Sequence, residues 1–476
     1  MNKGVLIAAI LAIIVLGMMY VYGLDNNLMS YDEGSTYLYP SLMARMGHDL
    51  YSELPSNLPP ILLLLAPFSV IAGRVMTLMM LAIACLLLYK AGKRFGVGVF
   101  AVLFLLSCPI VMEFGKVYMG DIPIIMFMTL FILLVITKAK TYRGGIVYGI
   151  ATGIVMFLAI MTKLQLGVPF IILLGVLLLL DRHCIHSDRY MASVVVFILL
   201  VGLFVTQPMF KELFVDNFNS VITVKEWIVM VRDSVAIFVN KASFMLAFTF
   251  LGLCECIRRR DERKVQVLLI VLGTAIITVL SYSFFNYRYF IYLLPVLSIM
   301  AGMGLKSLKN SWLAIAVVCL AVFVPLAEFH ESTLYDSDTR AISSMVANMT
   351  KQGDYIYTDE PMIAYLSERQ MPPMAHMWNW LGKYRGLNED VVINEIREYK
   401  PKVVALVTSV PYQKMTRPRV ESVFGIDGGK KIIDYLDCNY QGKTYHSRNY
   451  QYMTIWYDPD FLGENLSYSV DTEYNG

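Results

Sequence analysis

The chain has 476 residues, of which 57% are hydrophobic and 16% are charged, and its formal net charge is +3. An average soluble domain carries about 25% charged residues, so the composition excludes an ordinary soluble protein. The net charge is too small to predict nucleic-acid binding, and we expect no nucleic-acid partner.

Apolar runs recur along the first two thirds of the chain, and many approach the roughly 17–25 residues that a helix needs to cross a bilayer. Basic segments separate them at 90–94, 138–143, 182–189, 258–264 and 306–309. Because Lys and Arg are retained on the cytoplasmic side, all five are expected inside. This condition predicts about eleven transmembrane helices, near 4–22, 75–90, 97–112, 122–138, 144–161, 167–180, 190–208, 234–253, 265–283, 289–305 and 311–328. In this integral, multi-pass protein of the cell membrane, the N-terminus is then cytoplasmic and the last part of the chain extracytoplasmic.

Two apolar segments need a separate interpretation. The first, which starts Met-Asn-Lys, has the composition of a signal peptide, but no small-residue cleavage site follows it, so an uncleaved anchor is favoured. The second, Pro59–Ala72, is short and contains three prolines. It is therefore predicted to be interfacial or re-entrant rather than a span.

Polar and aromatic residues become dense after Glu328, and residues 329–476 are predicted to form a small extracytoplasmic α/β domain. Residues 1–328 then form the transmembrane domain, whose first external loop covers 24–74. In the C-terminal domain, the patterns predict three strands and one helix, at Tyr355–Thr358, Val403–Val407, Met453–Trp456 and Val391–Tyr399.

The first external loop carries an acidic pair, Asp32-Glu33. Charge near the membrane is costly and often functional, although acidic residues also flank spans as plain interfacial residues. Further motifs follow in the loop or at the predicted outer ends of helices: Gly47-x-x-x-Tyr51, Pro59-Pro60, Gly73-Arg74, Tyr118-Met-Gly-Asp121-Ile-Pro123, Thr162-Lys163, and Tyr287-Arg288-Tyr289 with Pro295.

This order of motifs resembles the GT-C superfamily of membrane glycosyltransferases, in particular the branch of protein mannosyltransferases and aminoarabinose transferases. The resemblance implies transfer of a sugar from a dolichyl or undecaprenyl phosphate, collectively polyprenyl phosphates, to an acceptor hydroxyl at the extracytoplasmic face. The acceptor is a protein, a lipid or a glycan. Aminoarabinose transferases tend to carry a basic residue immediately before Pro-Pro, whereas this chain has Leu58. One phosphate contact is therefore missing or supplied elsewhere, for example by Arg74 or Lys116.

The resemblance points to Asp32 as the general base that removes the acceptor proton. Glu33 and Asp121 are expected to bind or orient the acceptor. The leaving lipid phosphate gains negative charge as its bond breaks, and cations stabilise that charge. The predicted donor-phosphate residues are Arg74, Lys163, Arg288 and Tyr289.

These residues also have structural interpretations. A lone Arg or Lys at a helix end can extend to lipid headgroups, and Asp121 can start the helix ahead of Pro123. Asp32 and Asp121 could share a divalent cation, but no Asp-x-Asp pair appears, so no metal and no other cofactor is assigned.

Two other functions compete with a transferase. A transporter or flippase of lipid-linked sugars would place polar residues or helix breaks in mid-membrane, whereas the charges here gather at the predicted outer ends of helices. A sensor with an external ligand-binding domain leaves the pattern from Asp32 to Pro60 unexplained. The sequence therefore favours chemistry at the membrane surface.

Overall fold

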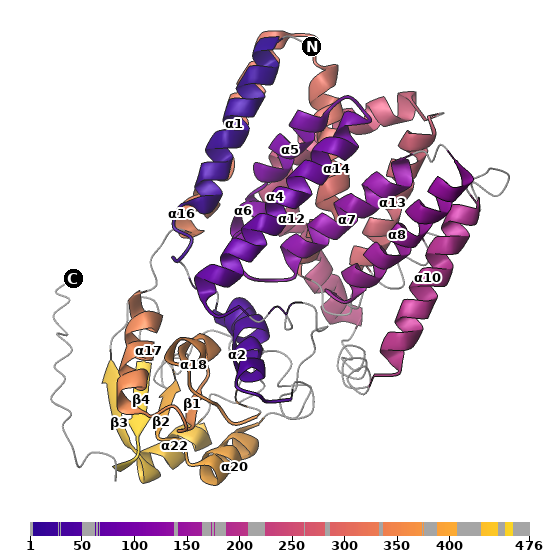
Figure 1. Ribbon diagram of the computed structural model, residues 1–476. Coiled ribbons are helices and arrows are strands. Elements are labelled where there is room, and N and C mark those ends of the chain that lie inside the picture. Colours follow the sequence, from indigo (N-terminus) through magenta and orange to yellow (C-terminus); the bar gives the residue numbers. More distant parts are fainter. Residues whose placement is uncertain are drawn as a thin grey trace. The chain divides into compact units, whose positions relative to one another are not determined.

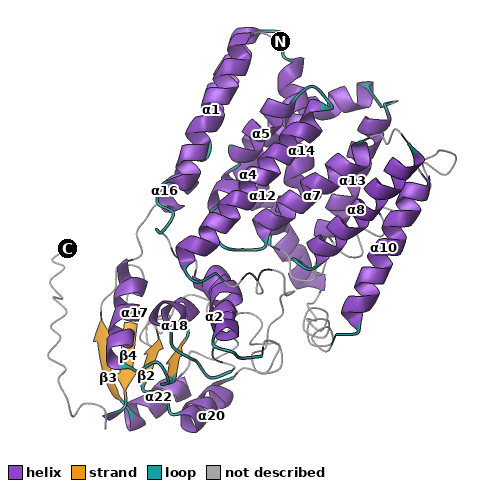
Figure 2. Ribbon diagram, in the orientation of Figure 1, coloured by secondary structure: helices purple, strands orange, loops and turns teal. Residues whose placement is uncertain are grey.

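The computed structural model describes residues 3–26, 28, 30–49, 62, 65, 67–137, 141–163, 173, 176, 187–207, 224–260, 262–280, 286–332, 337–373, 375, 388–406, 430–445 and 453–459. Its internal contacts divide the chain into two compact units. Unit 1 comprises Met1–Asn26, Leu58–Leu64 and Ser69–Leu334, and unit 2 comprises Asn27–Asn57, Leu65–Phe68 and Tyr335–Gly476. The described part of unit 1 is helical, whereas unit 2 combines helices with a sheet (Figure 2).

Unit 1 is a bundle of helices (Figure 1). In chain order they are α1 (Lys3–Val21), α4 (Val70–Lys93), α5 (Gly98–Leu106), α6 (Pro109–Phe114), α7 (Asp121–Ile136), α8 (Tyr142–Ile160), α10 (Ser187–Val205), α12 (Val224–Arg258), α13 (Arg263–Leu280), the 3-10 helix η3 (Tyr287–Leu293), α14 (Leu294–Ser307), α15 (Ser311–Phe323) and α16 (Leu326–Ser332). Among the described residues, six helical stretches are long and apolar enough to cross a membrane. The prediction of a helical, multi-pass membrane protein is confirmed. The number of spans stays a prediction, since most of 167–180 lies outside the described residues.

Several helices differ from their predicted bounds. The predicted span 97–112 is two helices, because Cys108 is extended before Pro109 and the helix restarts there. Helix α4 starts five residues early, at Val70, where the Ser69 side chain accepts a hydrogen bond from the Ala72 amide. Helix α12 runs for 35 residues, well beyond the predicted span.

The centre of unit 1 is α14, where every residue from Leu294 to Leu305 is buried. It packs against α12 at two glycines, Gly252 and Gly304, where an added Cβ would collide with the carbonyl oxygens of Met300 and Phe248. Small residues allow helix backbones to approach this closely inside membranes. Larger side chains at these positions would push the two helices apart.

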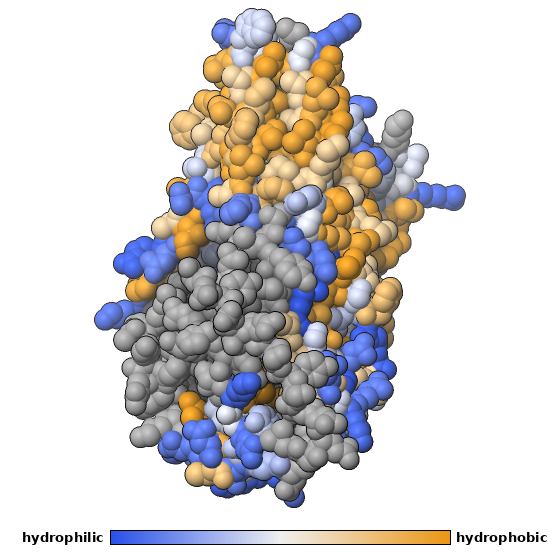
Figure 3. All heavy atoms as spheres, turned by 90° about the vertical axis from the view of Figure 1, so that its left-hand side faces the viewer, coloured by the Kyte–Doolittle hydropathy of each residue, from blue (hydrophilic) through white to orange (hydrophobic). Residues whose placement is uncertain are grey.

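The face of the helical bundle that Figure 3 shows is largely apolar. Large hydrophobic side chains stay exposed on several helices, including Met18 at 66%, Leu199 at 61% and Trp312 at 80%. Soluble proteins rarely leave such continuous apolar surface in water. This surface is suited to contact lipid chains.

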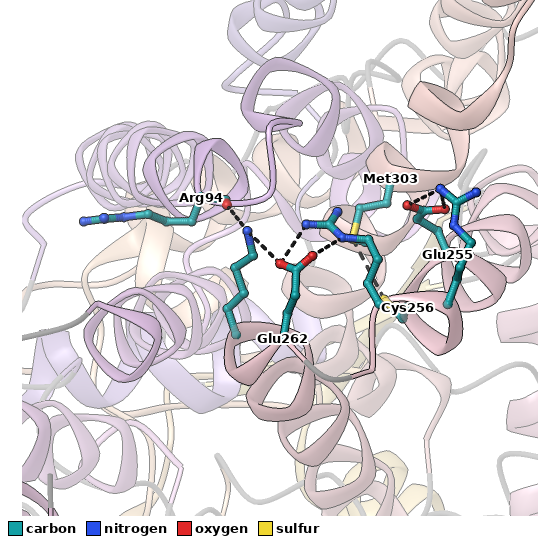
Figure 4. Close-up of polar contacts among 8 residues, drawn as sticks. Arg94, Glu255, Cys256, Glu262 and Met303 are labelled. Atoms are coloured by element: carbon teal, nitrogen blue, oxygen red, sulfur yellow. Dashed lines mark hydrogen bonds and ion pairs between the residues drawn. The ribbon is translucent and has the colours of Figure 1, made fainter. Parts of the chain in front are cut away.

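One end of unit 1 is held by ion pairs at the turn between α12 and α13 (Figure 4). Arg259 donates from Nε and Nη2 to the two carboxylate oxygens of Glu262, at 2.6 and 2.9 Å. Lys264 lies 3.1 Å from the same carboxylate and donates to the Arg94 carbonyl at the end of α4, at 3.0 Å. The basic segment 258–264, predicted to be cytoplasmic, therefore links the turn between α12 and α13 to the end of α4.

Unit 2 contains a four-stranded sheet in the order β1-β2-β4-β3, with β1 and β2 parallel and the other pairs antiparallel. Its elements are the π-helix η1 (Ser30–Leu38), α2 (Tyr39–Arg45), α17 (Ser337–Met349), β1 (Ile356–Thr358), α18 (Pro361–Ser367), α20 (Glu389–Tyr399), β2 (Val403–Leu406), α22 (Lys430–Asn439), β3 (Gln441–Tyr445) and β4 (Met453–Tyr457). The three predicted strands and the predicted helix are present. Strand β3 was not predicted, because Gln-Gly-Lys-Thr-Tyr lacks apolar alternation.

The first external loop folds with the C-terminal segment in unit 2. Helix η1 packs on α18, where a Cβ on Gly34 would lie 3.1 Å from the Met362 amide nitrogen. The Met371 amide donates to the Tyr39 hydroxyl at 2.6 Å, and Tyr39 is fully buried. The sequence pattern predicts this loop to be part of the transmembrane domain. The structure groups residues 27–57 with unit 2 instead, because the apolar side of α2 is buried there.

Candidate active site

A buried ionic cluster forms where three segments of unit 1 meet. Asp121 is the first residue of α7 and is 1% exposed. Lys163, just after α8, donates from Nζ to Asp121 Oδ1 at 3.3 Å. Arg288, on η3, places Nε 3.7 Å from Asp121 Oδ2. Three predicted site residues from distant parts of the sequence are therefore in contact.

Aromatic rings complete this cluster. Lys163 Nζ lies 4.7 Å from the ring centroid of Tyr289, the fourth predicted site residue, and 5.7 Å from that of Tyr292. The Arg288 guanidinium carbon lies 5.9 Å from the Phe114 ring. Aromatic faces attract cations, and the attraction strengthens when water is excluded. The rings therefore help to keep both cations in place.

The local backbone sets the direction of these groups. Asn286 caps η3 by accepting a hydrogen bond from the Arg288 amide at 3.0 Å. Asp121 occupies the first turn of α7, where the helix dipole favours a carboxylate. Asp121 therefore both starts helix α7 and forms ion pairs with Lys163 and Arg288.

Asp121 faces both Lys163 and Arg288. Two cations that share one carboxylate bring positive charge together at one place in unit 1. Lysine and arginine are the side chains with which proteins bind phosphate groups. The cluster therefore has the chemical groups that a phosphate site needs.

A second ionic network joins residues that the sequence motifs do not include. Lys241 on α12 donates to Glu113 on α6 at 2.9 Å and to Glu328 on α16 at 2.6 Å. The Tyr287 hydroxyl donates to the other oxygen of Glu113 at 2.6 Å. Because Tyr287 directly precedes Arg288, this network anchors the start of η3. The signal in the sequence was Lys241 itself, a charge inside an apolar run, which is often functional.

Arg74 lies near a different cation, Lys116. Arg74 is 1% exposed, and its Nη1 donates to the carbonyls of Leu24 and Asn26 at 2.9 and 2.6 Å. Lys116 is 2% exposed, donates to the Tyr22 carbonyl at 3.1 Å and has no ion pair among the described residues. Burial and then the Arg74 charge lower the pKa of Lys116 to about 8. Arg74 and Lys116 therefore form a second place in unit 1 where two positive charges lie near each other.

The acidic pair of the first loop lies on η1, in unit 2. Both Asp32 and Glu33 belong to this nine-residue π-helix, a rare conformation that is frequent at functional sites. Glu33 is fully buried. Burial raises the pKa of Tyr365 to about 12, and the neighbouring Glu33 carboxylate adds to this rise. The structure thus places the predicted base and the predicted phosphate residues on different units.

Comparisons with known proteins agree on the fold. The family described as dolichyl-phosphate-mannose-protein mannosyltransferase matches residues 59–206. The crystal structure of ArnT from Cupriavidus metallidurans in the apo state has a TM-score of 0.65 at 13% identity, over 97% of this chain and 99% of that chain. The same protein bound to undecaprenyl phosphate has a TM-score of 0.62 at 13% identity, with the same coverage.

A cryo-EM structure of the arabinofuranosyltransferase AftD from mycobacteria is similar over 96% of this chain and 40% of that chain, with a TM-score of 0.51 at 12% identity. No curated protein sequence matches the chain. The chain has the fold of the ArnT structures, and the family match agrees with the resemblance that the motifs indicate.

Proposed function

We propose that the chain is a glycosyltransferase that moves a sugar from a polyprenyl phosphate to an acceptor hydroxyl at the extracytoplasmic face of the membrane. The observation that carries the proposal is the cluster of Lys163 and Arg288 around Asp121, in a chain with the GT-C fold. A lysine and an arginine gathered in this way are suited to bind a lipid phosphate. The ArnT structure bound to undecaprenyl phosphate supports this class of donor.

The proposed reaction is a single displacement with inversion at the anomeric carbon. The acceptor oxygen attacks that carbon while the bond to the phosphate oxygen breaks. The acceptor proton passes to the Asp32 carboxylate, which acts as general base. Polyprenyl phosphate leaves with the bonding electrons, and its growing negative charge is the quantity that the protein must stabilise.

The cations have distinct proposed roles in this step. Arg288 presents a planar guanidinium that can donate two hydrogen bonds to a phosphate, whereas Lys163 acts as a point charge. Tyr289 holds Lys163 beside the phosphate. Asp121 keeps the two cations oriented, and Glu33 orients the acceptor beside Asp32. Arg74, with Lys116, is proposed to contribute positive charge in place of the basic residue that Leu58 replaces.

A direct assay tests the transferase proposal. The full chain in lipid nanodiscs is incubated with a panel of undecaprenyl- and dolichyl-phosphate sugars and with hydroxyl acceptors of the three classes. We expect release of polyprenyl phosphate in a one-to-one ratio with glycosylated acceptor. Movement of the intact lipid-linked sugar across proteoliposomes without any release would instead show a flippase.

The lowered pKa of Lys116 makes donor binding sensitive to pH. Lys116 is charged below its folded pKa of about 8 and loses its proton above it. Undecaprenyl phosphate keeps its charge in this range, since the second pKa of a phosphate monoester is about 6. We therefore expect its affinity to fall roughly 10-fold or more between pH 7 and pH 9.

The matched control is Lys116→Met, measured by equilibrium binding over the same pH range. This variant should bind undecaprenyl phosphate weakly at pH 7, and its affinity should change little up to pH 9. A wild-type affinity that stays constant from pH 7 to pH 9 would remove Lys116 from the phosphate site.

A further inference from the structure

Unit 2 contains a cavity of about 340 Å³ that the proposed transfer step does not use. Its walls come from α2 and the turn after it, the start of β1, the segment after α18 and the end of α20. The lining residues are Met43, His48, Tyr355, Gln370, Met371, Pro373 and Tyr399. Pockets for small ligands typically measure about 300–1,000 Å³ and combine apolar walls with a few polar groups. The cavity therefore has the size of a site for a small ligand.

Backbone hydrogen bonds fix the walls of this cavity. The Ile356 amide donates to the Gln370 carbonyl at 2.9 Å, so the segment after α18 lies along β1, an edge strand of the sheet. The next amide, that of Met371, donates to the buried Tyr39 hydroxyl. These bonds fix the position of the first loop against the C-terminal segment. They also occupy part of the β1 edge, which leaves less of it for a peptide strand to pair with.

Three polar groups in the lining lack a hydrogen-bond partner among the described residues. They are the hydroxyls of Tyr355 and Tyr399 and the side-chain oxygen of Gln370. The Gln370 amide nitrogen has only the Met46 sulfur, at 4.0 Å. All three side chains are half-buried. Polar groups in such positions usually find partners, so they are available to a ligand.

The chemical groups in the cavity walls indicate which kind of ligand would fit. The rings of Tyr355 and Tyr399 lie edge to face, with centroids 5.0 Å apart. Burial raises the pKa of Tyr399, so its hydroxyl remains a donor at neutral pH. Among the described residues that line the cavity there is no Lys, Arg, Asp or Glu. These walls therefore match a neutral molecule that has apolar faces and several hydroxyls.

We propose that this cavity binds one or two rings of a neutral carbohydrate. The tyrosine rings contact the apolar C–H face of the sugar, and the phenol and amide groups replace the water molecules that its hydroxyls lose. The cavity then holds part of a glycan acceptor. This last assignment rests on the proposed transferase function, whereas carbohydrate binding by itself does not.

Saturation-transfer NMR on the full chain in nanodiscs tests the inference. The probes are methyl glycosides of glucose, galactose, mannose and N-acetylglucosamine, with methyl glucuronide as the charged comparison. We expect at least one neutral glycoside to bind and to be favoured over the glucuronide. Gln370→Leu and Tyr399→Phe, which keep the side-chain volume, should each weaken binding about 3- to 10-fold. Gln352→Leu, the same change at an exposed position, should leave it unchanged.

The outcomes separate this inference from the proposed function. Absence of binding for all four neutral glycosides, or equal binding in wild type, Gln370→Leu and Tyr399→Phe, would overturn the carbohydrate site. Thermal unfolding of each variant shows whether a loss of binding comes from misfolding, and Tyr399→Phe keeps the ring if Gln370→Leu does not fold. Binding without sugar transfer in the assay would leave this site standing and reject the transferase.

Discussion

Replacement of Asp32 with asparagine is expected to lower the rate of sugar transfer about 10²- to 10⁴-fold, the usual contribution of a general base. Asparagine keeps the size and polarity of the side chain but cannot take the acceptor proton. The measurement is kcat at saturating donor, together with the affinity for undecaprenyl phosphate. We expect the affinity to be unchanged, because in the proposed reaction the base acts on the acceptor.

Asp49→Asn provides the matched control, since Asp49 is an exposed aspartate of the same loop and unit. It should transfer sugar at the wild-type rate. Turnover within a few-fold of wild type in Asp32→Asn would remove Asp32 from the mechanism, whatever the control shows. A parallel loss in both variants would point to the fold of the loop rather than to proton removal.

Asp121→Asn is expected to destabilise the protein by about 3–5 kcal/mol, because it removes the buried carboxylate that Lys163 and Arg288 both contact. Undecaprenyl phosphate should recover part of this loss, since a phosphate supplies the missing negative charge. The measurement is unfolding in nanodiscs with and without the lipid. The lipid should stabilise the variant more than it stabilises the wild type.

The control is Asp233→Asn, which breaks the exposed ion pair between Arg232 and Asp233, at 2.8 Å. Exposed pairs contribute up to about 1 kcal/mol, so this variant should remain close to wild type. If Asp121→Asn is equally mild, Lys163 and Arg288 are extended to lipid headgroups instead of being paired. The phosphate assignment for these two cations would then be wrong.

The sequence was informative where one physical signal dominates. The lengths of the apolar runs located the helices of unit 1. The positions of Lys163 and Arg288 at the ends of predicted helices followed from the same runs. Their meeting at Asp121 did not, because helix packing between residues 42 or more positions apart leaves no mark in local spacing. The network of Glu113, Lys241 and Glu328 was hidden for the same reason.

Short elements in unit 2 were harder to predict. The segment Ser30–Arg45 was described as a loop, although it forms η1 and α2. Its helical signal is weak, since Gly34 and Pro40 disfavour helix interiors, and its stability comes from packing on α18. Gly47, which opens the Gly47-x-x-x-Tyr51 motif, has a positive φ of 94°, a conformation that is readily available to glycine.

Helix α12 has a consequence for the membrane in which the protein works. At 1.5 Å per residue, its 35 residues extend about 52 Å, whereas the hydrocarbon layer is about 30 Å thick. Its first turns carry the exposed charges of Arg232 and Asp233, which belong outside that layer. Close packing on α14 restricts how far α12 can tilt, so an apolar stretch longer than the layer is accommodated by local thickening of the surrounding lipid. The acyl-chain length of the lipids therefore affects the stability of the protein in a bilayer and the membrane in which it accumulates.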